Sequence, residues 1–321
     1  MSRGFYIFFE KKKQKKFFVP FFILGILYLL WYILAMKHKI AFYLFFISII
    51  FICENVFASA QISLFTEEKI KDFLTVRIEL KSAKDDEALK RIDEIEKEVF
   101  AELEKNAVDF EQERLILESF YFMEKYEHAL NPNENRDLLR REMKTLMKKC
   151  FDCLDSRGEE ASKWLYNVCG DVTSYYMTRS VKATFFYGLK VKTMYEKAVL
   201  LDATLPTANV SLGNWFFYAP RIFGGGKDKA RDCYCAALKG STTEGEKYIA
   251  YQALSQLYFE ENNMSLCAFN FDKARSLNIG EKELDLMKRC NDAGYSLFQY
   301  RRNRAGIDEK IPEEYKDAED K

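Results

Sequence analysis

The sequence has few of the residues that interrupt regular structure, with only five prolines and 14 glycines among 321 residues. Proline and glycine mark most tight turns, so their scarcity leaves room for few turns and favours long helices. Net charge is also lacking, because 49 basic side chains balance 49 acidic ones. This balance argues against nucleic acid as the main partner. No segment of the chain beyond its first 60 residues shows a β-strand pattern.

Histidine is almost absent, since the chain contains only His38 and His128. His38 falls in a segment that we interpret below as a signal peptide, so one histidine would remain. A single histidine excludes a His-clustered metal site, and any Ser-His-Asp arrangement would depend on His128 at the end of a charged helix. The carboxylates are spread in mixed sign along helix faces and form no visible acid–base pair. We therefore expect no catalytic residues and no enzyme activity.

Seven cysteines follow residue 60, and two pairs, Cys150 with Cys153 and Cys233 with Cys235, have spacings that suggest zinc. Both pairs fall in the middle of expected helices, without the turns of a zinc knuckle. We interpret them as small buried side chains, with a disulfide in an oxidising compartment left open. The Gly-rich run before Lys227 also lacks the Ser or Thr of a phosphate loop. No metal and no cofactor is predicted.

The first 60 residues combine two apolar runs with basic clusters. Residues 17–35 are apolar, long enough to span a bilayer, and follow five lysines. Residues 36–60 read as a complete signal peptide, with Lys37 and Lys39, an apolar run at 40–53 and an Ala-x-Ala site that predicts cleavage after Ala60. Residues 1–35 would then be an over-extended start or a transmembrane helix.

Two alternatives remain for this segment: a membrane hairpin, which opposes the positive-inside tendency, and lipidation at Cys53, which the bulky Ile52 disfavours. The favoured interpretation and the hairpin alike predict a body exported to the periplasm or cell envelope. The body is membrane-anchored if the apolar runs are retained. Membrane contact is expected only through the first 60 residues.

The rest of the chain shows a helical period throughout and predicts one all-α domain. Residues 61–160 are expected to form an N-terminal helical region, 161–305 repeated helix pairs with a capping helix, and 306–321 a disordered charged tail. Helices are expected at 67–80, 86–104, 111–130, 136–154, 160–178, 181–201, 207–218, 227–238, 245–261, 264–277 and 281–302.

Within this region, a pattern of large and small residues recurs at the spacing of a tetratricopeptide (TPR) unit. One junction consists of Tyr195, Ala198, Pro206, Leu212, Gly213 and Phe216, and the following helix contributes Ala230, Tyr234 and Ala237. A further unit carries Tyr251, Leu254, Ser255, Tyr258, Cys267, Phe271 and Ala274. Small residues at these positions let two helices approach, and stacked pairs bury what one pair cannot.

Over residues 164–277 the chain thus resembles the TPR repeat superfamily. More weakly, its long helix pairs and its Gly-Gly-x-x-Lys-Ala-Arg run resemble exported TPR-like proteins associated with TRAP transporters, the T-component family. The first resemblance implies a solenoid of helical hairpins. The second implies a periplasmic partner, a TRAP-type solute-binding protein.

In the TPR superfamily the partner faces the first helix of each pair, and the matching positions here are Asn214, Phe217, Tyr218, Gln252, Gln256 and Phe259. Aromatic rings beside amides can hold a partner by stacking and hydrogen bonds. We expect a non-catalytic scaffold that binds a protein partner in the cell envelope. The alternative is a small-molecule or lipid binder with a pocket between the long helices, lined by Tyr175, Tyr176, Phe185, Phe186 and Tyr187.

Overall fold

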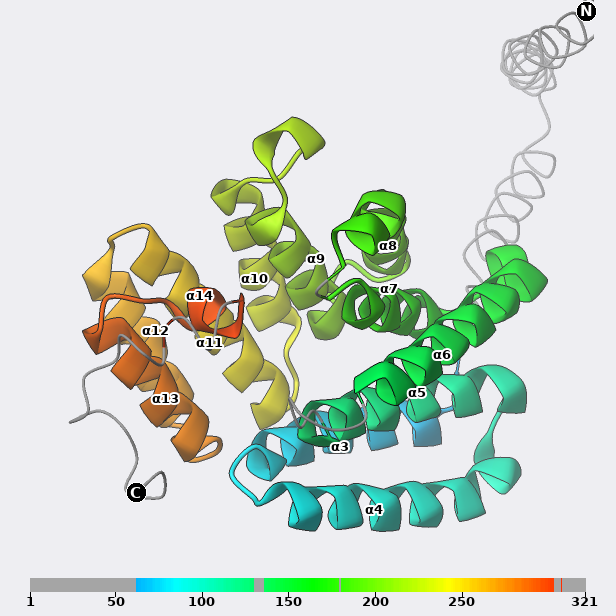
Figure 1. Ribbon diagram of the computed structural model, residues 1–321. Coiled ribbons are helices and arrows are strands. Elements are labelled where there is room, and N and C mark those ends of the chain that lie inside the picture. The colour runs from blue at the N-terminus through cyan, green and yellow to red at the C-terminus, as the bar shows by residue number, and fades with distance from the viewer. Residues whose placement is uncertain (1–61, 130–135, 179, 303–306, 308–321) are drawn as a thin grey trace, which may run out of the picture. The chain divides into compact units, whose positions relative to one another are not determined.

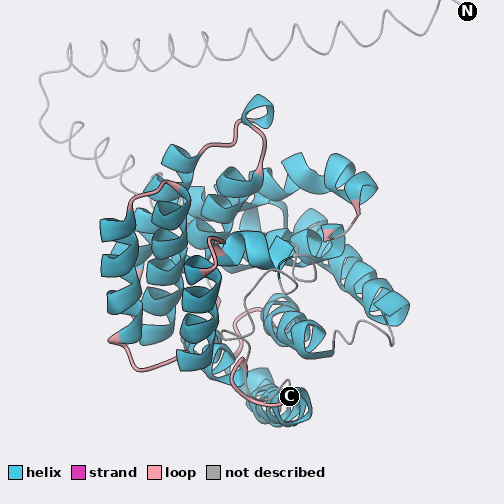
Figure 2. Ribbon diagram, turned by 60° about the vertical axis from the view of Figure 1, so that its left-hand side comes forward, coloured by secondary structure: helices cyan, strands magenta, loops and turns pink. Residues whose placement is uncertain are grey.

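A computed structural model describes residues 62–129, 136–178, 180–302 and 307, all within the unit Ser59–Lys321. These residues form twelve α-helices, two short 3-10 helices and no strand (Figure 1, Figure 2). The all-α prediction is confirmed for this part of the chain. The helices are α3 (Leu64–Leu80), α4 (Asp85–Asn106), α5 (Phe110–Ala129), α6 (Arg136–Arg157), α7 (Lys163–Met177), α8 (Val181–Leu201), α9 (Pro206–Tyr218), α10 (Lys227–Gly240), α11 (Glu244–Glu260), α12 (Met264–Arg275), α13 (Glu281–Asp292) and α14 (Leu297–Arg302), with η1 (Gly158–Glu160) and η2 (Arg221–Phe223).

Local chemistry explains where several helices begin. Ser63, Ser162 and Ser180 each accept a hydrogen bond from a backbone N–H in the first turn of α3, α7 and α8. Thr243 and Glu246 form a capping box at the start of α11. Such caps satisfy backbone donors that have no partner inside the helix.

The prediction of one helix over residues 281–302 is wrong, because the chain forms two helices there, α13 and α14. Gly294 adopts φ 86°, a left-handed conformation that glycine reaches without strain. The N–H of Tyr295 then bonds back to the carbonyl of Cys290 at 2.8 Å, which satisfies an end group of α13. The chain can turn here and send α14 in a new direction.

Consecutive helices pack in pairs, among them α4 with α5, α7 with α8, α9 with α10 and α11 with α12. Glycine permits the close approach in two of them. A Cβ atom at Gly170 would overlap the ring of Tyr195 across α7 and α8. One at Gly213 would overlap the ring of Tyr234 in the same way across α9 and α10. The small–aromatic spacing of the sequence thus corresponds to real contacts between paired helices.

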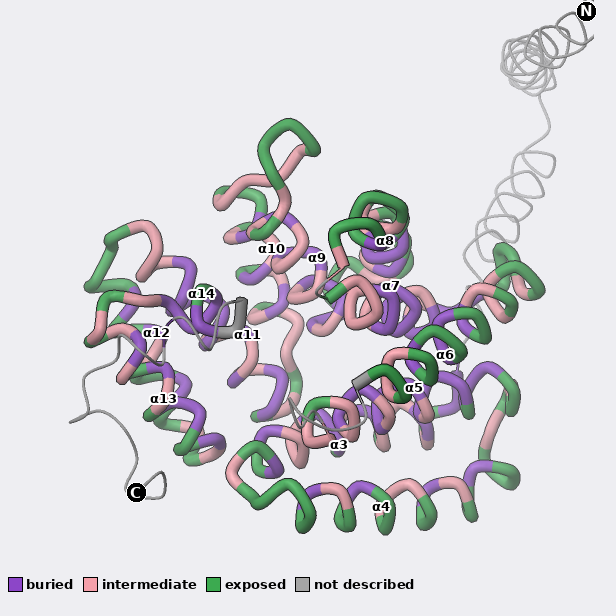
Figure 3. The backbone as a smooth tube through the Cα atoms, viewed as in Figure 1, coloured by how far each residue is buried: buried purple, intermediate pink, exposed green. Residues whose placement is uncertain are grey.

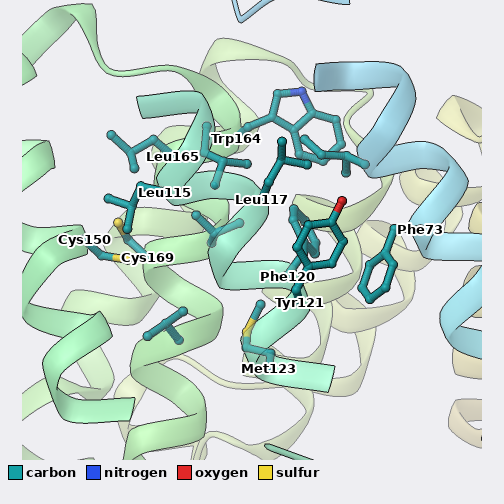
Figure 4. Packing of buried hydrophobic residues seen from close by; sticks show 14 of the residues in the cluster. Phe73, Leu115, Leu117, Phe120, Tyr121, Met123, Cys150, Trp164, Leu165 and Cys169 are labelled. Atoms are coloured by element: carbon teal, nitrogen blue, oxygen red, sulfur yellow. The ribbon is translucent and has the colours of Figure 1, made fainter. Parts of the chain in front are cut away.

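The largest core cluster lies among α3 to α8. Trp164 and Tyr121 are fully buried in it, and Phe73 meets Tyr121 edge to face at 4.7 Å between ring centroids (Figure 4). Cys150 and Cys169 are buried in the same cluster as free thiols. Burial raises the pKa of the Cys169 thiol, which keeps it protonated. Across the described residues no three His, Cys, Asp or Glu side chains group as metal ligands would.

Five alternate helices form a closed circuit. We call α3, α5, α7, α9 and α11 the inner helices, because each packs on the next and α3 also packs on α11. Gly245, in the first turn of α11, lies against the backbone of Thr75 in α3. Lys81 just after α3 pairs with Glu283 of α13 at 3.1 Å. Contacts between residues far apart in sequence therefore join the two ends of the helical stack.

The predictions for residues 1–60 and for most of the tail fall outside the described residues. Ile307 is the tail residue that the structure describes, and it is buried with Ile78 and Tyr248. Of the helices that are described, none combines the length and the hydropathy needed to cross a membrane.

Candidate functional site

The predicted partner-binding residues lie on α9 and α11, two inner helices that pack on each other. A segment of the chain itself covers part of this surface. The ring of Phe298 in α14 lies 4.6 Å from that of Phe217 and 5.8 Å from that of Tyr218, measured between centroids. The backbone N–H of Leu297 donates to the side-chain oxygen of Gln256. We call the surface formed by Asn214, Phe217, Tyr218, Gln252, Gln256 and Phe259 the α9–α11 groove.

Four of the groove residues, Phe217 among them, keep part of their surface free. Tyr218 is 46% exposed, and Asn214 and Phe259 are half-buried. Asn214 is held in place because its side-chain oxygen accepts a hydrogen bond from the hydroxyl of Tyr234 at 2.8 Å. The groove therefore combines a segment already bound with polar and aromatic surface that remains open.

Two amide groups in the groove have no acceptor among the described residues. They are the side-chain nitrogens of Gln252 and Gln256, one helical turn apart on α11 and both buried. A buried N–H group without an acceptor costs free energy, and these two nitrogens are closed to solvent, so a segment bound at the surface does not reach them.

The C-terminal segment is also tied to the end of α11. The hydroxyl of Ser296 donates to a carboxylate oxygen of Glu260, and Ser296 is fully buried. Lys227 donates to the backbone carbonyl of Glu260 at 2.8 Å and lies 3.5 Å from its carboxylate. These contacts hold the turn before α14 beside the groove.

A second polar arrangement centres on Asp171 of α7. Its carboxylate accepts hydrogen bonds, each 2.8 Å long, from Tyr195 of α8, Ser211 of α9 and Asn167 of α7. Burial raises the pKa of Asp171 to about 6, against the opposing effect of these donors and of Arg77. Most acceptor positions of the carboxylate are already used, so Asp171 acts as a hub that joins three helices.

A third arrangement links α3, α4 and α5. Arg77 and Glu124 form an ion pair, with 3.1 Å between Nε and the carboxylate oxygen. The two groups do not make a hydrogen bond. His128 lies 3.6 Å from Glu124 and 3.0 Å from Asp85. Burial alone would raise the pKa of Glu124, but the charge of Arg77 and the nearby ring of His128 outweigh it and lower that pKa. The same contact with Glu124 raises the pKa of His128.

The five aromatic residues of the alternative pocket are not brought together. Tyr175 meets Tyr126 of α5, whereas Tyr176 meets Tyr187 at 6.1 Å between centroids. Phe185 and Phe186 point into solvent, with 80% and 62% of their surface exposed. A shallow pocket of about 340 Å³ is lined by Asp137, Arg140, Arg141, Lys144 and Tyr176.

Sequence reasoning did not identify Arg77, Asp171 or Ser211. Asp171 directly follows Gly170, which faces the ring of Tyr195 as Gly213 faces that of Tyr234. A charged residue there must lie near the contact between paired helices. Nothing in the sequence indicated that α3 would bring Arg77 near α5 and α7, since that contact joins distant parts of the chain.

No protein-family model, no curated protein and no solved structure matches this chain.

Proposed function

We propose that this protein is a non-catalytic, TPR-like scaffold of the cell envelope that holds a protein partner in the α9–α11 groove. The observation that supports this proposal best is the way the groove holds residues 296–300. It uses aromatic contacts to Phe298 and a hydrogen bond to the backbone of Leu297, which are the contacts that a segment of another protein would need.

The exposed part of the groove favours a further segment beside the first. Tyr218 is 46% exposed, and Asn214, Phe217 and Phe259 are partly exposed. Aromatic side chains at the centre of an interface contribute much of its binding energy. A partner segment with one large apolar side chain fits this surface.

The closed circuit of inner helices limits what can be held. In an open solenoid an extended chain can run along the whole concave face. Here α3 packs on α11, so a long segment cannot pass between them. We therefore propose a short segment or loop of a folded partner, and the resemblance to T-component proteins favours a TRAP-type solute-binding protein.

Site-specific photo-crosslinking in the native cell tests this proposal. A photoreactive phenylalanine replaces Tyr218 in the full chain, and a matched one replaces Lys239, which is exposed on α10 away from the groove. We expect one envelope protein to be crosslinked from position 218 and not from position 239. Mass spectrometry then identifies the crosslinked protein and the segment involved.

Two results would count against the proposal. Equal crosslinking from both positions would mean that the groove has no special role. Crosslinks to cytosolic proteins alone would contradict both the export and the partner.

A further inference from the structure

The first half of α8 exposes large apolar side chains along one face. Val181, Phe185 and Leu189 follow one another at four-residue steps and are 89%, 80% and 58% exposed. Phe186 adds a ring beside that of Phe185, with 5.9 Å between centroids. Figure 3 shows this part of α8 largely in green, the colour of exposed residues. The four side chains form an exposed apolar patch, and such patches mark interaction sites.

Along α8, lysines flank this patch and no carboxylate does. Lys182 and Lys190 lie four residues before and after Phe186 and are both exposed. The sequence has no acidic residue between Asp171 and Glu196. The patch therefore has a rim of one sign, which complements a negatively charged surface.

The patch also projects beyond its neighbour. The indole N–H of Trp215, near the end of α9, donates to the carbonyl of Gly188 at 2.9 Å. Because α9 runs back along α8 and ends at Tyr218, the first turns of α8 extend past it. A flat surface can reach side chains placed in this way.

A pocket with basic side chains is linked to α8 through the contact between Tyr176 and Tyr187. Tyr176, which lines the 340 Å³ pocket, meets Tyr187 of α8, and the ammonium of Lys190 lies 5.9 Å from the ring of Tyr187. Arg140, Arg141 and Lys144 line the same pocket together with one carboxylate, that of Asp137. Three cations against one anion suit a phosphate-bearing headgroup.

We propose that this face of α8 docks on a bilayer that contains anionic lipids, with the phenylalanines in the headgroup region and the lysines at the phosphates. Helices that lie on membranes carry this combination of apolar side chains and a basic rim. Protein–protein interfaces, in contrast, are depleted in lysine. The apolar runs at residues 17–35 and 40–53 would bring the body close to such a surface if they are retained.

Quenching by brominated lipids tests the proposal directly. Phe185→Trp and Phe269→Trp are compared in the full chain with vesicles of phosphatidylcholine alone or with phosphatidylglycerol, both carrying bromine on the acyl chains. Phe269 is the matched control, because it is 55% exposed on α12 and has Lys273 over its ring at 5.6 Å. Fluorescence of the unsubstituted protein is subtracted, and thermal unfolding confirms that each variant folds.

We expect strong quenching of the indole at position 185 in anionic vesicles, weaker quenching in neutral ones and little at position 269. Adding Lys182→Gln or Lys190→Gln to Phe185→Trp should weaken docking by about fivefold each. Equal quenching at positions 185 and 269, or none at 185, would overturn the proposal. So would protection of position 185 by a protein partner without lipid. The groove between α9 and α11 is not involved, so this proposal and the proposed function can fail separately.

Discussion

At the scale of single residues, the chain places charged side chains where burial and hydrogen bonding oppose each other. Glu124 is almost fully buried, yet its pair with Arg77 keeps it ionised. Asp171 accepts three hydrogen bonds and still has a raised pKa, because burial has the larger effect. Glu124 and Arg77 join α5 to α3, and Asp171 joins α7 to α8 and α9. These carboxylates make the stability of the fold depend on pH.

We predict that Asp171 makes the protein less stable as pH rises from about 4 to 6. In that range the unfolded chain has lost the proton that the folded chain, with a pKa of about 6, still binds. Unfolding in urea at several pH values should show the free energy of unfolding of wild type, minus that of Asp171→Asn, falling by up to about 3 kcal/mol across this window.

Asp202 is the matched control, because its pKa is lowered and not raised. Its carboxylate pairs with Lys163 at 2.8 Å. Burial would raise that pKa, and the bond from Lys163 and those from Thr204 outweigh it. The stability from Asp202 is therefore present above pH 4 and is lost as pH falls. The difference between wild type and Asp202→Asn should rise with pH, and a parallel fall for both variants would contradict the assignment.

At the scale of helices, the approach of two paired helices depends on a glycine facing an aromatic ring. Tyr234 cannot move away from Gly213, because its ring is fully buried and its hydroxyl bonds to Asn214. A methyl group at position 213 must therefore push α9 and α10 apart. The recurring spacing of the sequence has its physical basis in this contact.

We predict that Gly213→Ala destabilises the protein by about 1–3 kcal/mol, the usual cost of overpacking. Gly188→Ala is the control, because a Cβ atom there would meet nothing within 4 Å. It lies in the interior of α8 and should stabilise the protein by about 0.5–1 kcal/mol. Equilibrium unfolding in urea measures both changes, and a stabilising Gly213→Ala would show that the two helices do not pack in this way.

At the scale of the whole described body, the contact of α3 with α11 turns a stack of helix pairs into a closed circuit. A Cβ atom at Gly245 would lie 2.8 Å from the backbone nitrogen of Thr75, and a backbone atom cannot turn aside as a side chain does. This contact therefore contributes to holding the first and last pairs together.

We predict that Gly245→Ala destabilises the protein by about 1–3 kcal/mol and loosens α3 more than α9 or α10. Hydrogen exchange followed by mass spectrometry should show faster exchange in α3 and unchanged exchange in α10. Glu244→Ala, at an exposed neighbouring position, should leave both unchanged. Uniformly faster exchange along the chain would instead mean that α3 and α11 do not form a separate junction.

The sequence by itself determined the all-α fold, the bounds of most helices and the pairing through small and aromatic residues. These features follow from local spacing, capping and side-chain size, which act between residues near one another in the chain. Tertiary structure alone decided that α3 closes on α11, that Arg77 meets Glu124, and that α14 turns back to cover part of the groove. Such contacts join segments far apart in sequence. They depend on the angle and distance at which each intervening helix packs on the next.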